Sequence, residues 1–493
     1  MSTPSPERQD PRPSASASAA DGGGPPEAGA VDVGVGSGVG PGVGRGPGSG
    51  VGRDPGPDVG LWSRNFTLFF TARTVAKLGD LMLPVALAAG LVREGGGAGA
   101  VGAAMASFTA SFAGLVIFGG VFADRFDTRR LMIGSDLVRV ITQTITAVLF
   151  LTGHVALWSI CLIGVINGVC AAMFQPGVAS TVPLIARDVQ AANAAVRTAE
   201  SGMAVLGPAT AGVLVGLTSA GGVFAVHAGT YLVSALCLIA LRLPRGPRTS
   251  SAPGGDRTAF RADLVEGWRE FAARRWMWGV IVIWMVFMAA AWGPSVPLAA
   301  TEIINEHGER VYGLINSGLG VGMVLGGLLA LRIRPVRPLR AGAVALFGFV
   351  PQPVAIGAAL PVPLITGASV LAGAALAFWG VMWATSVQTQ VPGAVLNRIH
   401  AYEVAGSLVM LPVGQALAGP AAGLFGAQQV LLAGGFVSLA VCVALLSVSA
   451  IRGLRRVDAP PDLRGAPRHG PAARPCDARP SDERPCDDRL AES

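Results

Sequence analysis

The chain has 493 residues, of which 51% are hydrophobic and 14% are charged, and its mean hydropathy is +0.55. These values lie outside the usual range of soluble proteins and predict a polytopic membrane protein. The formal net charge of +7 does not indicate nucleic-acid binding, because the excess is almost entirely arginine placed between apolar segments. The six cysteines have neither the pattern of a disulfide framework nor the spacing of metal ligands, so we expect no metal and no cofactor.

The two ends of the chain differ in composition from the rest. Residues 1–60 consist mainly of Gly, Pro, Ser and Ala with scattered charges, and residues 458–493 are polar. Neither segment can bury enough apolar area to offset the entropy of ordering, so both are predicted to be disordered tails. Residues 1–60 also lack the apolar core of a cleavable signal, so we expect the first membrane helix to direct insertion.

Between these tails, the sequence predicts an all-α integral membrane fold. A helix that crosses a bilayer needs about 20 mostly apolar residues. Twelve such segments begin near residues 64, 98, 130, 155, 189, 220, 276, 310, 340, 362, 395 and 427. Arginines concentrate in the joins after even-numbered spans, so the positive-inside rule places both chain ends in the cytoplasm and the spans in the cell membrane.

The spans divide into two groups of six. Residues 244–275 form the longest internal connection and separate an N-terminal bundle, 61–243, from a C-terminal bundle, 276–457. The connection contains "RADLVEGWREFAARR", which puts Leu264, Trp268 and Phe271 on one helical face. This pattern suits a helix on the cytoplasmic membrane surface, and a solvated linker helix is the alternative.

The two halves also resemble each other. "STVPLIARDVQAAN" at 180–193 has a counterpart in "TQVPGAVLNRIHAY" at 389–402, and "GPATAG" at 207–212 is echoed by "GPAAG" at 419–423. Duplicated six-helix halves are typical of secondary transporters with a central site between two moving bundles.

A charged cluster interrupts the apolar sequence between the second and third spans. "GVFADRFDTRR" resembles the signature of the major facilitator superfamily, Gly-x-Leu-Ala-Asp-Arg-x-Gly-Arg-Lys. The positions that carry the resemblance are Gly120, Ala123, Asp124, Arg125, Arg129 and Arg130. Asp127 stands where the signature has glycine. The form "DRFDTRR" followed by "SDLVR" resembles the branch with enterobactin exporters and macrolide efflux proteins, and the resemblance covers about residues 62–455.

The resemblance implies a role for this loop as a latch that stabilises one of two alternating-access states. Asp124 would then face the start of the eleventh span near Arg398, and Asp136 and Arg139 would join the network. Glu200 and Glu403 occupy nearly equivalent places in the two halves, with Arg197 and Arg398 nearby, and are candidate gate residues. The alternative is that the charges only anchor the loop and set topology.

"GPATAG" in the fifth span resembles the exporter motif Gly-Pro-x-x-Gly-Gly, although Ala211 replaces the first of the paired glycines. Proline removes a backbone donor and glycine permits close approach, so Gly207, Pro208 and Gly212 can kink this helix and pack it tightly. Simple packing is as good an explanation as a role in antiport.

Ionisable side chains at membrane depth are costly and therefore candidates for function. In the first span, Arg73, Lys77 and Asp80 are spaced so that they share one helical face. Asp80 lies roughly 21 Å past Phe66, near the membrane midplane, and is our candidate for the coupling proton, with Glu200 as the next. The alternative is that Asp80 only balances Lys77. His227 alone in the sixth span is better explained by packing than by proton transfer.

These features predict a monomeric secondary transporter in the lipid bilayer that exports an amphipathic small molecule, such as a drug or a siderophore-like metabolite, in exchange for protons. Spans 1, 4, 7 and 10 would line the cavity. The aromatic residues expected there are Trp284, Trp292, Phe378, Trp379 and Trp383. Aromatic side chains that face lipid are the alternative for these five.

An importer of a small polar solute, driven by proton symport, is the main alternative function. A membrane-embedded enzyme and a nucleotide-driven pump are remote alternatives, because the sequence has no His/Asp metal cluster, nucleotide-binding loop or nucleophile elbow.

Overall fold

The computed structural model describes residues 62–125, 127–186, 188–242, 269, 272–391 and 406–456. The described residues are helical with short connections, and twelve of the helical segments are long and apolar enough to cross a membrane. This result confirms the predicted all-helical membrane fold. Both tails, the surface helix predicted around Leu264, Trp268 and Phe271, and the start of the eleventh span lie outside the described residues.

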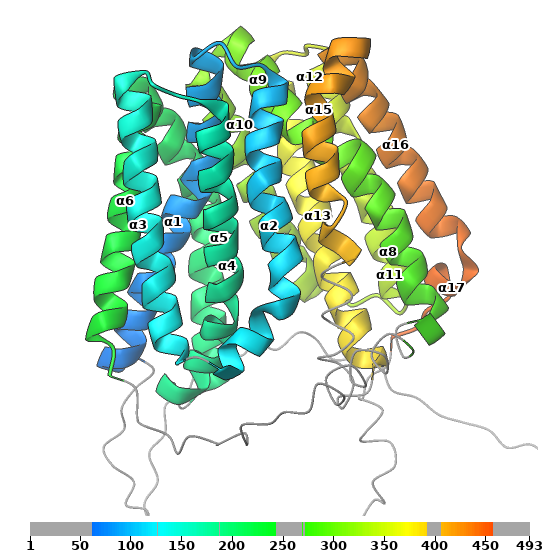
Figure 1. Ribbon diagram of the computed structural model, residues 1–493. Coiled ribbons are helices and arrows are strands. Elements are labelled where there is room, and N and C mark those ends of the chain that lie inside the picture. The colour runs from blue at the N-terminus through cyan, green and yellow to red at the C-terminus, as the bar shows by residue number, and fades with distance from the viewer. Residues whose placement is uncertain are drawn as a thin grey trace, which may run out of the picture. The chain divides into compact units, whose positions relative to one another are not determined.

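The N-terminal group contains six unbroken helices (Figure 1). They are α1 (Arg64–Arg93), α2 (Ala98–Arg125), α3 (Thr128–Thr152), α4 (Leu157–Ile185), α5 (Val189–Leu217) and α6 (Ala220–Ala240). Side chains that accept hydrogen bonds from the first turn mark several starts: Ser63 for α1, Asp127 for α3, Asp188 for α5 and Ser219 for α6. Asp127, the residue that departs from the family signature, therefore has a local structural role.

The C-terminal group is less regular. Its elements are α8 (Arg275–Phe287), the π-helical turn η1 (Met288–Trp292), α9 (Gly293–His307), α10 (Glu309–Arg332), α11 (Pro338–Ala345), the 3₁₀ turn η2 (Leu346–Phe349), α12 (Pro351–Gly357), α13 (Val362–Gln390), α15 (Leu411–Phe425), α16 (Ala427–Ser447) and α17 (Ser449–Arg452). The seventh span combines α8, η1 and α9, and the ninth combines α11, η2 and α12.

Prolines explain both irregular turns. Pro294 has no N–H for the carbonyl of Ala290, and just before it the Gly293 N–H bonds to the carbonyl of Met288, five residues back. Pro351 likewise offers no N–H to Phe347, and the Val350 N–H bonds to the Phe347 carbonyl at 3.2 Å instead. The two spans remain helical because the backbone shifts its hydrogen-bond spacing rather than breaking.

The twelve spans run back and forth between two ends of the bundle. We call the end where α1 and α3 begin and where Arg129, Arg242 and Arg332 lie the basic face, and the opposite end, with Arg93 and Glu309, the closed face. The basic face is at the bottom of Figure 1. Helix α5 packs on α10 and α2 packs on α15, and these pairs join the two groups.

The apolar cores differ between the two ends. One cluster takes residues from both groups, including Met82 and Phe224 from the first and Leu298 and Leu431 from the second, and it lies toward the closed face. Toward the basic face, the N-terminal group has its own cluster around Phe66, and the C-terminal group has others. The groups therefore share a core on one side and keep separate cores on the other.

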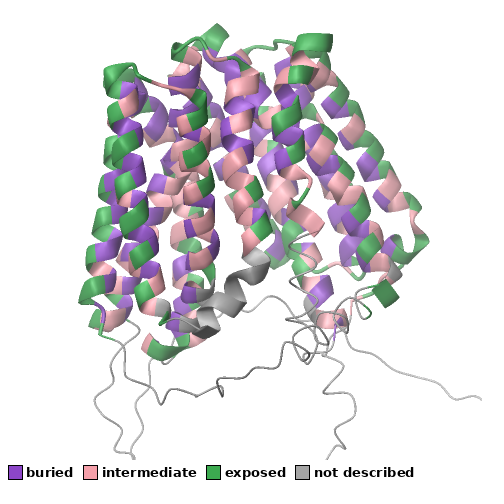
Figure 2. Ribbon diagram, viewed as in Figure 1, coloured by how far each residue is buried: buried purple, intermediate pink, exposed green. Residues whose placement is uncertain are grey.

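The outward sides of the helices are rich in exposed apolar residues. Figure 2 shows exposed positions along the outer faces and buried positions where helices meet. Ile141, Val148, Leu232 and Leu236 are among the exposed aliphatic side chains. Such a surface suits lipid as the surrounding solvent.

Candidate functional site

A cavity of about 460 Å³ lies between the two groups of helices. Most of its lining comes from α1 to α4 and α6, while the C-terminal group contributes Trp292, Val296 and Gln415. The wall is mainly apolar, with Phe108, Phe112 and Trp292 among its aromatic side chains, and has a few polar groups. A cavity of this size and composition suits a small amphipathic molecule.

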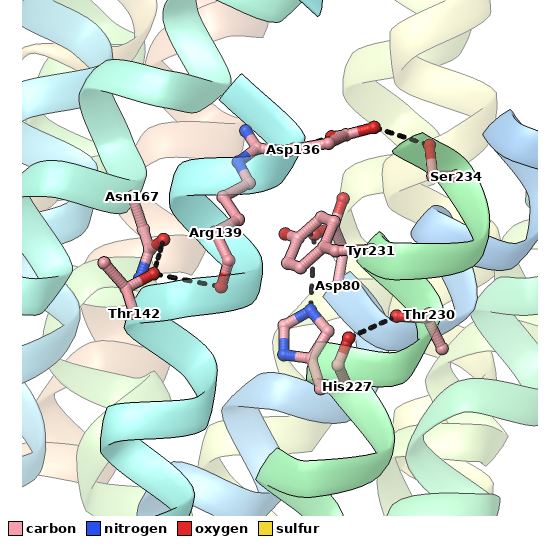
Figure 3. A network of polar contacts seen from close by, with 9 residues as sticks. All are labelled: Asp80, Asp136, Arg139, Thr142, Asn167, His227, Thr230, Tyr231 and Ser234. Carbon is pink, nitrogen blue, oxygen red and sulfur yellow. Dashed lines mark hydrogen bonds and ion pairs between the residues drawn. The ribbon is translucent and has the colours of Figure 1, made fainter. Parts of the chain in front are cut away.

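Asp80 is the acid in the wall of this cavity (Figure 3). The Tyr231 hydroxyl donates a hydrogen bond to Asp80 Oδ1, and His227 Nε2 lies 3.8 Å from the same oxygen. The Asp80 side chain is 36% exposed, whereas His227 behind it is 1% exposed. One carboxylate therefore faces the cavity and is held from behind by two residues of α6.

Asp136 and Arg139 extend this network from α3. The Ser234 hydroxyl donates to Asp136 Oδ2 at 2.6 Å, and Arg139 Nη1 lies 4.0 Å from Asp136 Oδ1. The Arg139 guanidinium lies 5.1 Å from the ring centre of Tyr231 and 5.7 Å from that of Phe174. The sequence associated both residues with the charged loop, but the structure places them inside the bundle, in the Asp80 network (Figure 3).

Arg73 and Glu200 form a separate pair. Arg73 Nε donates to Glu200 Oε1 at 2.8 Å, and Arg197 Nη1 lies 3.3 Å from Glu200 Oε2. They line a polar pocket of about 430 Å³ next to the central cavity. The structure thus keeps Glu200 with arginines rather than with Asp80.

Lys77 lines both the polar pocket and the central cavity. It has no ion pair within 4 Å with any acid of the described part of the chain, Asp80 included. Of the three ionisable residues predicted on one face of the first span, only Asp80 joins the inner network. The two side chains thus form no direct ion pair, and the interpretation that Asp80 only balances the charge of Lys77 stays an open alternative.

Trp292 is the one of the five predicted aromatic residues that lines the central cavity. Trp284 stacks on Trp379 with ring centres 5.8 Å apart, and Trp379 stacks on Trp383 at 6.4 Å, inside the core of the C-terminal group. Phe378 is buried and borders an outer pocket between α11 and α13. The period of a helix does not reveal which of its sides faces the centre, and most of these rings face neighbouring helices.

The glycines of the fifth-span motif mediate close packing. A Cβ on Gly207 would come 2.6 Å from Leu81 Cβ on α1, and a Cβ on Gly212 would come 3.1 Å from Gly313 Cα on α10. Pro208 lies inside α5 between them. The motif thus lets α5 pack closely against α1 on one side and against α10 of the C-terminal group on the opposite side.

The charged loop is described only in part. The backbone of Gly120, Asp124 and Arg125 belongs to the end of α2, but the surroundings of these residues are not described. Arg398 and Glu403 lie outside the described residues altogether. Arg129 donates to the carbonyls of Leu238 at 2.9 Å and Ile239 at 2.6 Å, at the end of α6. Arg130 is exposed, and its backbone N–H bonds to Asp127. Arg129 therefore anchors the loop, while the contact predicted between Asp124 and Arg398 stays a prediction.

Sequence reasoning did not single out Tyr231 and Ser234. They follow His227 at four and seven residues, which places all three on one face of an otherwise apolar helix. The same spacing identified the polar face of the first span. A search for polar residues at helical spacing in every span would have found this face as well.

Comparison with known proteins agrees with this architecture. The model of the Major Facilitator Superfamily matches residues 69–402, more than half of the chain. The chain belongs to the major facilitator superfamily. It is therefore a multi-pass membrane transporter of small molecules and not an enzyme.

Three superfamily relatives match most of the chain. An uncharacterized MFS-type transporter, YvqJ, of Bacillus subtilis is 23% identical and covers 81% of this chain and 95% of its own. Macrolide efflux protein A of Streptococcus pyogenes is 20% identical, and the match covers 80% of this chain and 98% of the relative. The enterobactin exporter EntS of Citrobacter koseri is 28% identical, and the match covers 73% of this chain and 85% of the relative.

A solved superfamily structure shows the same fold. The bacterial homolog of the human lysosomal transporter Spinster, in an inward-facing and unoccupied conformation, superposes with a TM-score of 0.61. Its sequence is 15% identical, and the match covers 81% of this chain and 100% of that one. The likeness at this identity concerns the fold alone.

Proposed function

We propose that this transporter exports a small amphipathic molecule in exchange for protons, and that Asp80 is the residue that binds the coupling proton. The observation that carries the proposal is the position of the Asp80 carboxylate. It faces the central cavity, accepts a hydrogen bond from the Tyr231 hydroxyl, lies 3.8 Å from His227 Nε2, and forms no ion pair within 4 Å with Lys77.

A carboxylate at such a place can serve two ligands in turn. A charge inside a membrane protein is costly unless it is paired, so Asp80 gains from binding either a proton or a polar group of a substrate. The two compete for the same oxygens, because Asp80 is the acid among the described residues that line the cavity. Competition of this kind couples the outward movement of substrate to the inward movement of protons.

The arrangement of the two halves suits loading of substrate from the cytoplasm, which is the first step of export. The positive-inside rule assigns the arginine-rich basic face to the cytoplasm. In the plasma membrane, both chain ends would then also lie in the cytoplasm. The shared core and the ion pair from Arg93 Nε to Glu309 Oε1, at 2.6 Å, then lie toward the outside. We infer that this state receives its substrate from the cytoplasmic side and that the protein works as a monomer.

The relatives also favour export, since two of them bear the names of an efflux protein and an exporter. Macrolides and siderophores are both amphipathic molecules with polar groups, which is the substrate class that the mainly apolar cavity suits. The loop with Asp124 is proposed to stabilise one of the two states as a latch.

Transport in inverted membrane vesicles tests this proposal. The vesicles are given radiolabelled erythromycin or radiolabelled enterobactin under an imposed pH gradient. Separately, a strain that lacks the gene is screened for increased sensitivity to a panel of antibiotics. Accumulation inside the vesicles that collapses when the gradient is dissipated is the expected result for at least one compound. Gradient-driven loss of a preloaded polar solute would instead support the importer.

A further inference from the structure

His227 is a buried histidine whose packing is unusual for a purely structural residue. It is 1% exposed, and neither Nδ1 nor Nε2 has a hydrogen-bond partner in the described part of the chain. Buried ring nitrogens normally have partners, because a buried polar atom without one loses the hydrogen bond it would make to water. A histidine that keeps both nitrogens without partners therefore calls for a functional explanation.

The surroundings hold the ring beside Asp80. Gly79, the neighbour of Asp80 on α1, lies against the ring, and a Cβ there would collide with His227 Cδ2 and with Thr230. Tyr231 packs on the other side, with ring centres 4.7 Å apart. The imidazole is thus fixed between α1 and α6 with Nε2 directed at the carboxylate (Figure 3).

Other charged groups surround the pair on every side. The groups of the neighbouring elements are Asp80 and Lys77 on α1, Asp136 and Arg139 on α3, and Tyr231 on α6 itself. Helix α5 also contacts α6, and its Glu200 pairs with Arg73 of α1 at 2.8 Å and with Arg197 at 3.3 Å. Among the described residues, His227 Nε2 is the basic nitrogen within 4 Å of the Asp80 carboxylate, at 3.8 Å, while Arg139 lies 4.0 Å from Asp136 and over the ring of Tyr231.

We propose that His227 is the second member of the coupling site and that Asp80 and His227 together bind the transported proton. A proton from water in the cavity binds the exposed Asp80 carboxylate. It then transfers to His227 Nε2, which leaves an imidazolium beside the restored carboxylate. The restored carboxylate is then paired with the imidazolium, so it no longer offers a free charge to the substrate, and the proton stays behind Asp80 until the direction of access changes.

This inference rests on the proposed function, but one of its tests does not need transport. The chain has five histidines, so selective ¹⁵N-histidine labelling of the whole protein in detergent gives a simple NMR spectrum. His227→Gln identifies the signal. If that variant does not fold, replacing His154, His307, His400 and His469 leaves His227 as the only labelled ring.

In the unchanged protein, acidifying the buffer is expected to convert the ¹⁵N signals of the His227 ring from the neutral to the imidazolium form. In Asp80→Asn this conversion should differ, because the carboxylate beside Nε2 is then lost. A ring that stays neutral in the unchanged protein, or signals that respond identically in Asp80→Asn, would overturn the inference whatever the transport assays show.

The transport arm uses a matched control. His307 Nε2 lies 3.8 Å from Glu306 Oε2, the same separation, but that pair is exposed and outside the cavity. His227→Gln should lower pH-driven uphill export by about tenfold or more while downhill exchange continues. His307→Gln should transport like the unchanged protein, and an equal effect of both substitutions would refute a specific role for His227.

Discussion

Arg129 shows how a single side chain fixes the charged loop. It donates to two carbonyls at the end of α6, where the last carbonyl groups of a helix have no partner within the helix. A cation also interacts favourably with the helix dipole at this end. This contact explains a basic residue here independently of topology.

Replacing Arg129 by Gln should lower stability by about 2 kcal/mol, because charge-assisted hydrogen bonds contribute more than neutral ones. The midpoint of thermal unfolding in detergent checks this. The neighbouring substitution Arg130→Gln is the control, since that side chain is exposed. Equal midpoints for the two variants would contradict the anchoring role.

At the same scale, the sequence predicted part of the site. Asp80 was singled out because it is an acid at membrane depth, and the structure places it in the cavity wall. Its partners Tyr231 and His227 could not be assigned from the sequence, because helical spacing shows which residues share a face but not which helix packs against it. The same limit explains why the sequence associated Asp136 and Arg139 with the charged loop and not with Asp80 and Ser234.

At the scale of elements, the starts of the described spans were largely predictable. The apolar segments begin where capping residues such as Ser63, Asp188 and Ser219 precede them. The irregular turns η1 and η2 were not predicted, although Pro294 and Pro351 mark them. Proline alone does not reveal whether a helix kinks, breaks or widens by one residue.

Contacts between helices of different halves depend on glycine. A Cβ on Gly419 of α15 would collide with Gly99 on α2, near the closed face. One turn further along α15, a Cβ on Gly423 would meet nothing within 4 Å. The first position therefore requires glycine for close approach, and the second does not.

Gly419→Val should reduce export by about tenfold or more, because the added methyl groups keep α2 and α15 apart and the closed face cannot form. Gly423→Val should leave export unchanged. Efflux of a labelled substrate at equal membrane abundance measures both. Similar rates for the two variants would argue against closure at this contact.

At the scale of the whole molecule, the distribution of contacts defines one of two states. The halves share a core at the closed face, where Arg93 and Glu309 form an ion pair with 46% and 17% of their side chains exposed. An ion pair this exposed contributes about 1 kcal/mol or less. It can bias the equilibrium between two states without locking it.

Glu309→Gln should therefore favour the state open at this face by about fivefold or less. A cysteine at Val296, which lines the cavity, reports the change when all native cysteines are removed. Its labelling by a membrane-impermeant maleimide from the outer side should become faster. Glu306→Gln on the same face is the control, and an equal acceleration there would refute a gate formed by Glu309.

The central claim is that Asp80 couples export to protons, and proteoliposomes with an imposed pH gradient test it most directly. Asp80→Asn removes the charge but keeps the shape, so it should abolish uphill export while downhill exchange of the same labelled substrate largely continues. Normal downhill exchange shows that the variant is folded and binds substrate. Uphill export that persists in Asp80→Asn would contradict the account and make Glu200 the next candidate.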